Sequence, residues 1–180
     1  AIDSNKYIWI EKTPKHLHHI NEITKEISNV KFIHIIRNGK NNIASLYHAR
    51  NKYSDTWAKG RIVKGKSLNR CINRWKKDIQ ISKLFLGKEN HFHLFYEELI
   101  SDTSRVILNL YKFLDLDTNN IFINNEKHNQ VITNNEPWKK NNSKSIRKTK
   151  SKFNSILSDN QKKEVSNKIN HIILEKEFEK

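Results

Sequence analysis

The sequence predicts an α/β fold in which helices flank a parallel sheet. Short apolar runs, typical of buried strands, alternate along the chain with longer segments whose apolar residues recur at helical spacing. Parallel strands need a crossover connection, usually a helix, so this alternation favours parallel pairing. The 180 residues are enough to bury a sizeable core, and we treat residues 1–180 as a single domain.

The first half of the chain predicts two strand–helix units. Residues 7–10 (YIWI) are the first expected strand, which ends in the polar loop 11–14. The run at 32–36 is the second, and its apolar character is typical of a strand covered on both faces. A helix of about three turns is expected after the first strand, and an amphipathic helix after the second. The apolar positions of these helices are Leu17, Ile20, Ile23 and Ile27, and then Ile43, Leu46 and Tyr47.

The turn that follows the second strand is the most informative part of the sequence. Arg37 stands where that strand ends, and Asn38-Gly39 is a turn signal. Ligands of open α/β sheets bind at the carboxyl ends of strands, against the first turns of the next helix. Arg37, together with Ser45 two turns into that helix, therefore predicts a clamp for an oxyanion or phosphate.

The second half of the chain predicts three more helices and one more strand. An apolar stripe predicts a helix over 68–86, and HFHLFY at 91–96 predicts a strand closed by Glu97-Glu98. A helix over 103–114 is expected with Ser101 or Asp102 as its cap. Ser158 to Gln161 fits a capping box before a final helix that bears Val165, Ile169, Ile172 and Ile173. Residues 53–67 and 116–144 are expected to be irregular.

Composition limits the classes of protein that fit. No stretch is apolar enough to span a membrane, and no signal peptide is visible. The single cysteine, Cys71, cannot form an internal disulfide, which favours a reducing compartment. The formal charge of +15 suggests an anionic partner. However, the richness in lysine, isoleucine and asparagine is typical of an AT-rich genome, so much of this charge is discounted.

Three motifs in order resemble the sulfotransferases that use 3′-phosphoadenosine-5′-phosphosulfate (PAPS). They are IEKTPKHL, KFIHIIRNGKNNIASLYHAR and HLFYEELISDTSRVILNLYKFLDL, and the match spans residues 7–116 with a weaker echo at 145–161. The chain is most similar to the protein-tyrosine and heparan-sulfate branches, and LNRCINRWKKDIQ also resembles the tyrosine branch. The resemblance implies a P-loop-NTPase-like sheet and sulfuryl transfer from PAPS to a hydroxyl or amine, without a metal.

The resemblance assigns roles to the turn described above. Arg37 and Ser45, eight residues apart, match the arginine and serine that bind the 3′-phosphate of the donor. A planar guanidinium can hold a phosphate through two hydrogen bonds, and a helix-borne hydroxyl adds a third donor. The alternative is that Arg37 caps the sheet through a surface salt bridge and Ser45 is a small packing residue.

Lys12, in the EKTP loop, matches the family lysine that contacts the sulfuryl group in transfer. An ammonium there would stabilise the charge that develops in the transition state. Tyr96 resembles a tyrosine near the donor nucleotide, but it fits a core aromatic equally well. Arg147 and Lys148 stand where cytosolic relatives carry an Arg-Lys-Gly loop over the 3′-phosphate. Thr149 replaces that glycine, so a solvated basic run is the alternative.

Two parts of such an enzyme are missing from the sequence. The glycine-rich turn that wraps the 5′-phosphosulfate is expected before residue 1, because none of the four glycines lies in such a setting. The general base glutamate is expected there too, and Pro14 replaces the histidine base of another branch. With no methionine in the chain, we expect an N-terminally truncated, inactive fragment that lacks the first strand of the sheet. Its expected location is the cytoplasm, or the Golgi lumen if a eukaryotic anchor was lost.

Other functions fit the sequence less well. The nine histidines lack the spacing of a zinc site, so no metal is expected. A P-loop kinase would show a Walker lysine motif or aspartates for Mg²⁺, and neither is found. A nucleic-acid-binding module would interleave aromatics along a basic face, whereas the aromatics here occupy apolar positions. The acceptor stays open among carbohydrates, protein tyrosine and small hydroxylated metabolites.

Overall fold

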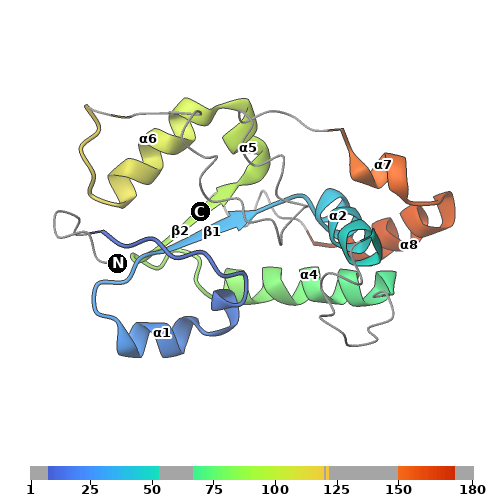
Figure 1. The fold of residues 1–180 in the computed structure, drawn as a ribbon, viewed down its shortest axis with the longest axis horizontal. Helices are drawn as coiled ribbons and strands as arrows, with labels where there is room; N and C mark the ends of the chain where they lie inside the picture. The colour runs from blue at the N-terminus through green and yellow to red at the C-terminus, as the bar shows by residue number, and fades with distance from the viewer. Residues whose placement is uncertain (1–7, 53–66, 120, 122–149, 173–180) are drawn as a thin grey trace.

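A computed structural model describes residues 8–52, 67–119, 121 and 150–172 of the chain (Figure 1). In chain order the described elements are η1 (His16–His18), α1 (Ile20–Glu26), β1 (Phe32–Ile36), α2 (Gly39–Lys52), α4 (Leu68–Lys83), β2 (His91–Phe95), α5 (Tyr96–Ser101), α6 (Thr103–Phe113), α7 (Lys152–Ile156) and α8 (Asp159–Ile169).

The two strands pair in parallel, as the alternation of strands and helices predicted. The register runs from Phe32 opposite His91 to Ile36 opposite Phe95. Helices α2 and α4 lie between the strands in sequence and supply the crossover that parallel pairing requires. Both strands therefore end at the same edge of the sheet, and the residues that follow them, Arg37 and Tyr96, leave from neighbouring positions.

Two expectations about the sheet are wrong for the described residues. Residues 8–10 form no strand, and Trp9 and Ile10 are 79% and 77% exposed. A strand needs a neighbour for its backbone groups, and no described strand pairs with them. Strand β1 is covered on one face only, because Ile33 and Ile35 are exposed while His34 and Ile36 are buried. Tyr7 lies outside the described residues.

The helices agree closely with the apolar periodicity. Ser67 caps α4 through its side chain, and Asp102, not Ser101, caps α6. The capping box of α8 is confirmed in full: Ser158 Oγ accepts from the Gln161 backbone N–H, and the Gln161 side chain accepts from the Ser158 backbone. Periodicity missed two short helices, α5 and α7, because a helix of five or six residues is too short to establish a period.

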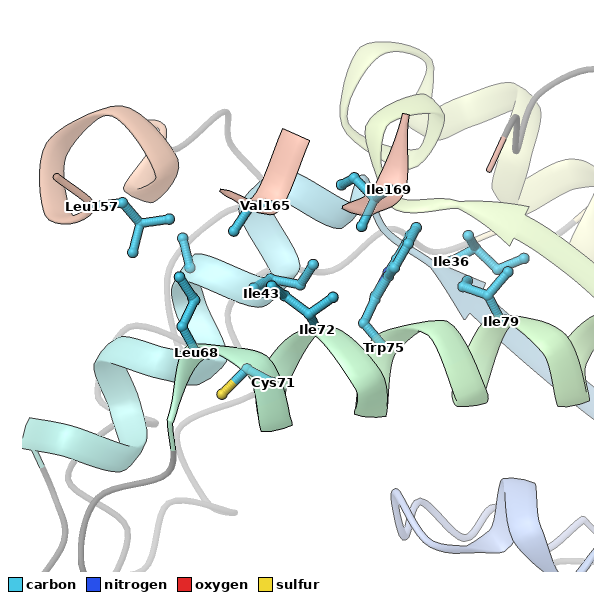
Figure 2. Close-up of a cluster of buried hydrophobic side chains, with 11 residues drawn as sticks. Ile36, Ile43, Leu68, Cys71, Ile72, Trp75, Ile79, Leu157, Val165 and Ile169 are labelled. Carbon is cyan, nitrogen blue, oxygen red and sulfur yellow. The ribbon is translucent and has the colours of Figure 1, made fainter. Parts of the chain in front are cut away.

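The described core lies where α2, α4 and α8 meet the end of β1 (Figure 2). Trp75 of α4 stands at its centre, between Ile169 of α8 and Ile36 of β1. A Cβ added to Gly39 would lie 2.7 Å from two atoms of the Trp75 ring and 2.9 Å from Ile169 Cδ1. The first residue of α2 is thus a glycine because the indole packs directly against its backbone.

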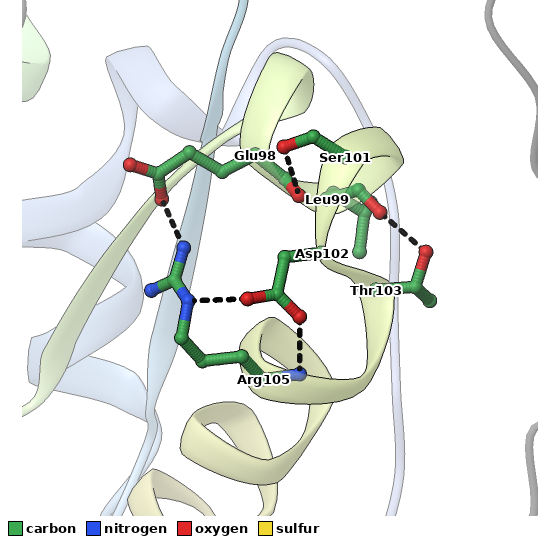
Figure 3. Close-up of polar contacts among 6 residues, drawn as sticks. All are labelled: Glu98, Leu99, Ser101, Asp102, Thr103 and Arg105. Atoms are coloured by element: carbon green, nitrogen blue, oxygen red, sulfur yellow. Dashed lines mark hydrogen bonds and ion pairs between the residues drawn. The ribbon is translucent and has the colours of Figure 1, made fainter.

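The corner between α5 and α6 is held by a small polar network (Figure 3). Asp102 accepts from the backbone N–H of Arg105 at 3.2 Å and from Arg105 Nε at 2.9 Å. Thr103 Oγ1 donates to the Leu99 carbonyl at 2.6 Å, which joins the start of α6 to α5. These contacts, together with β2, fix the position of α5, whose first residue is Tyr96.

Three histidines pack together on the buried face of the sheet. His34 Nε2 lies 2.9 Å from His91 Nδ1, and His34 Nδ1 lies 2.8 Å from Ser82 Oγ. His93 Nε2 donates to the Ser82 carbonyl at 3.1 Å, and its ring stacks on that of His34 with 4.2 Å between centroids. Burial, with His93 beside both rings, lowers the pKa of His34 to about 3 and that of His91 to about 4. The network is therefore neutral in the folded chain at pH 7.

Because these histidines are neutral in the folded chain, we expect the fold to lose stability in acid. In the unfolded chain His34 and His91 take up protons below pH about 6.5, whereas in the folded chain His34 resists protonation until pH about 3 and His91 until pH about 4. The free energy of unfolding should therefore be greatest above pH 6.5 and fall as the pH drops, with His34 alone contributing about 2 kcal/mol of the loss between pH 7.5 and pH 5. Urea titrations at the two pH values measure this loss. The same loss should occur in a His19→Gln control, since His19 is exposed; a flat pH dependence would contradict a neutral, buried network.

Gly39→Ala should lower the free energy of unfolding by about 1–3 kcal/mol, because the new methyl group overlaps the Trp75 ring and the packed core leaves little room to shift. Thermal and urea denaturation measure the change. Asn51→Ala, near the exposed end of the same helix, is the control and should stay within about 0.5 kcal/mol of the parent chain. Equal stability of the Gly39→Ala and Asn51→Ala variants would show that the Gly39–Trp75 contact does not constrain the fold.

Candidate anion-binding site

The adjacent ends of the two strands bring Arg37 and Tyr96 into contact. The Arg37 guanidinium carbon lies 4.7 Å from the centroid of the Tyr96 ring. Both residues are half-buried. A cation over an aromatic face is stabilised by the ring quadrupole, and the stacking also limits the rotamers available to the arginine. Tyr96 thus packs on the predicted anion-binding arginine.

The backbone around Arg37 is held by contacts from three elements. The Trp75 indole N–H donates to the Arg37 carbonyl at 3.4 Å, from α4. The next amide, Asn38 N–H, donates to Glu97 Oε1 at 3.1 Å, from α5. Asn38 Oδ1 in turn accepts from the Lys40 backbone N–H at 3.0 Å, which caps the first turn of α2. The turn is therefore well ordered for a segment at a sheet edge.

The Arg37 side chain has unused hydrogen-bonding capacity. Its Nε is buried, and no hydrogen-bond acceptor among the described residues contacts it. The alternative role considered from the sequence, a surface salt bridge that caps the sheet, is not observed with any carboxylate in the described part of the chain. A buried guanidinium N–H without an acceptor is costly unless a ligand supplies one.

Ser45 lies on the half-buried side of α2 that faces α7. Lys152 Nζ, from the first residue of α7, donates to Ser45 Oγ at 3.3 Å. The neighbouring Ser151 Oγ donates to Asn41 Oδ1 at 2.8 Å, so two hydrogen bonds join the start of α7 to α2. Ser45 therefore accepts a hydrogen bond and is more than a small packing residue.

Lys152 brings a second cation to the site. Its pKa is lowered, first by burial, then by the positive charge of Arg37 and that of Lys52. Like charges that lie together without an intervening carboxylate favour an anion between them. Arg37, Ser45 and Lys152 thus provide two cationic groups and a hydroxyl within one small region, with Tyr96 beside them. These are the donors that a phosphate or sulfate group requires.

The sequence analysis missed Lys152 and named its neighbours instead. Arg147 and Lys148 lie outside the described residues, so their predicted role stays a prediction. Basic residues occur at 147, 148, 150 and 152, and nothing in the spacing distinguishes one of them. The signal that could have singled out Lys152 is Phe153 and Ile156, which give the segment an apolar side that can pack against a helix.

In the described part of the chain, Lys12 makes no contact with Arg37, Ser45 or Tyr96. Lys12 is exposed in the loop before η1, next to the hydrogen bond from Thr13 Oγ1 to Glu11 Oε1 at 2.7 Å. The loop is anchored behind it, where His18 Nε2 and Asp78 Oδ1 of α4 are 3.0 Å apart. Among the described residues no hydrogen bond joins Lys12 to Arg37 or Ser45. The catalytic role of Lys12 remains a prediction.

The described residues contain neither a cluster of metal-ligating side chains nor a helix that could span a membrane. No three histidine, cysteine or acidic side chains in the described ranges converge in a way that could hold a metal ion. His91 and His93 do share one face of β2, as expected, but they contact His34 and Ser82. None of the helices described has the length and apolar character needed to cross a membrane.

The comparisons with known proteins agree with the resemblance drawn from the motifs. Searches of curated proteins and of solved structures return no match to this chain. A family model described as "Sulfotransferase family" matches residues 2–120, which is well over half of the chain. The matched region contains Arg37, Ser45 and Tyr96 and ends before α7. The chain belongs to the sulfotransferase family.

Proposed function

We propose that this chain forms the 3′-phosphate half of a PAPS site and serves sulfuryl transfer to an acceptor hydroxyl or amine. The observation that carries the proposal is the proximity of Lys152, which contacts Ser45, to Arg37, whose buried Nε has no acceptor among the described residues. A dianionic phosphate would supply that acceptor and separate the two positive charges. The family assignment supports sulfuryl transfer, and the geometry supports a nucleotide phosphate as the group held here.

Each residue has a distinct part in holding the donor. Arg37 would donate two hydrogen bonds from its planar guanidinium, and Lys152 would act as a point charge opposite it. Ser45 Oγ accepts from Lys152 and keeps its own hydrogen to donate to the ligand. Tyr96 holds the guanidinium in place and offers an aromatic edge toward the nucleoside. Arg147 and Lys148 are proposed as further cations of the same region.

We place Lys12 at the other end of the donor. When bound, PAPS supplies a sulfuryl group whose bond to the 5′-phosphate oxygen breaks as a bond to the acceptor oxygen or nitrogen forms. An ammonium beside those oxygens would stabilise the charge that grows as the bond breaks, more in the transition state than in the ground state. The EKTP context supports this role. We also propose the P-loop-like sheet of the family as the full architecture, of which β1 and β2 are two strands.

Arg37→Ala should weaken binding of the product nucleotide 3′-phosphoadenosine-5′-phosphate (PAP) about 30-fold or more, since it removes the bidentate, charge-assisted donor. Lys152→Ala should weaken it about tenfold. Isothermal titration of PAP into the 180-residue chain measures both affinities. Lys163→Ala, which removes an exposed lysine of α8, is the charge-matched control and should change the affinity less than twofold. If all three variants lost affinity equally, binding would reflect net charge and not this site.

Lys12→Ala should lower the turnover of sulfuryl transfer about 100-fold or more while PAP affinity stays within about twofold of the parent. The reason is that the ammonium acts on charge that develops at the sulfuryl end, away from the 3′-phosphate. Radiolabel transfer from PAPS measures the turnover separately from the PAP affinity. The assay uses a preparation that is active before the substitution. Lys15→Ala, three residues along the same exposed loop, is the control. An unchanged turnover for Lys12→Ala would remove Lys12 from the mechanism.

A further inference from the structure

We infer that Glu97 is a positioning residue for donor binding: its carboxylate orients the Arg37–Asn38 turn so that Arg37 meets the phosphate. The inference rests on the proposed function and assigns a role to a residue that the motifs did not single out. Glu97 Oε1 accepts from the backbone N–H of Asn38 at 3.1 Å. This contact joins α5, which follows β2 directly, to the residue that follows Arg37.

Two consecutive residues of α5 hold two consecutive residues of the turn. The ring of Tyr96 lies against the guanidinium of Arg37, and the carboxylate of Glu97 accepts from the amide of Asn38. The first contact limits the direction of the side chain, and the second limits the direction of the peptide that carries it. Tyr96 and Glu97 are the first two residues of α5, so both contacts come from one helical turn. The hydrogen bonds at the corner between α5 and α6 fix the position of this helical turn.

The charge of Glu97 makes its location informative. A carboxylate beside a site for a dianion weakens binding by simple repulsion. Glu97 nevertheless lies one residue from Tyr96, and in the described part of the chain its contact is with a backbone amide, not with a cation. A negative charge at the first turn of α2 is favourable to that helix, since Asn38 precedes its first residue. The role inferred for Glu97 is therefore to order the turn as an acceptor, with a benefit to Arg37 that exceeds its repulsion of the ligand.

The adjacent residue offers a matched comparison. Glu98 belongs to the same short helix and carries the same charge, but its Oε2 lies 3.8 Å from Arg105 Nη2, on the side of α6 (Figure 3). Removing either carboxylate raises the net charge by one. Only the removal of Glu97 releases the Asn38 amide. Repulsion and positioning therefore predict opposite signs for Glu97→Ala: tighter anion binding if repulsion dominates, and weaker binding if positioning does.

The test is isothermal titration of PAP into the 180-residue chain and four variants, with thermal unfolding followed in parallel. Glu97→Ala should weaken PAP binding about five- to tenfold. Glu97→Gln, which keeps an acceptor oxygen and loses the charge, should bind at least as tightly as the parent. Glu98→Ala should stay within about twofold, and Arg37→Ala should show the larger loss proposed above. Unfolding temperatures of the two Glu97 variants should agree within about 2 °C, since the contact is exposed.

The outcomes separate this inference from the proposed function. If the parent chain does not bind PAP, both are overturned. If the parent binds and Arg37→Ala does not, but Glu97→Ala binds as well as the parent or better, the proposed function stands and the positioning role is overturned. The positioning role is also overturned if Glu97→Gln fails to restore affinity, or if Glu98→Ala loses as much as Glu97→Ala.

Discussion

The packing of Trp75 against Gly39 is the contact on which the rest of the described structure depends. The indole ring fills the space that a side chain at Gly39 would occupy, and its N–H donates to the Arg37 carbonyl. A single residue of α4 therefore sets how closely α2 approaches the core and where β1 ends. Ile169 of α8 packs on the same spot, so three helices share this point with the strand. Small residues permit such close backbone approach because they have no Cβ to displace.

The packing of Trp75 against Gly39 also determines the position of the anion-binding site and the charges that meet there. Once α2 lies close to α4, Ser45 faces α7, and the hydrogen bonds from Ser151 and Lys152 join α7 to α2. This packing also brings Lys152 close to Arg37, and the two cations repel each other in the absence of a ligand. Functional sites often contain buried polar groups without hydrogen-bond partners and like charges that lie close together. The bound ligand supplies the missing hydrogen bonds and the opposite charge.

The histidine network shows a different use of polar groups inside the fold. His34, His91 and His93 satisfy one another and Ser82 on the face of the sheet toward the end of α4. Their site is the opposite end of β2 from Tyr96, since His91 begins the strand and Tyr96 follows it. Hydrogen bonding among neutral rings, with Phe32 and Phe85 stacked on His91, orders this end of the sheet, while the core around Trp75 orders the other end. The two halves of the sheet thus depend on different chemistry.

Sequence alone determined the parallel strand–helix order, most helix positions and the caps of α6 and α8, because these follow from periodicity and local chemistry within a few residues. It also placed Arg37 at the end of β1 and Ser45 on the following helix, while their joint role in anion binding stays a prediction. The tertiary structure decided which faces of the sheet are covered and which basic residue reaches Ser45. Periodicity showed that β1 is apolar, but the exposure of Ile33 and Ile35 depends on what packs against them. Lys152 reaches Ser45 through the contact of α7 with α2, more than 100 residues apart in sequence, and the spacing of the basic residues does not encode such a contact.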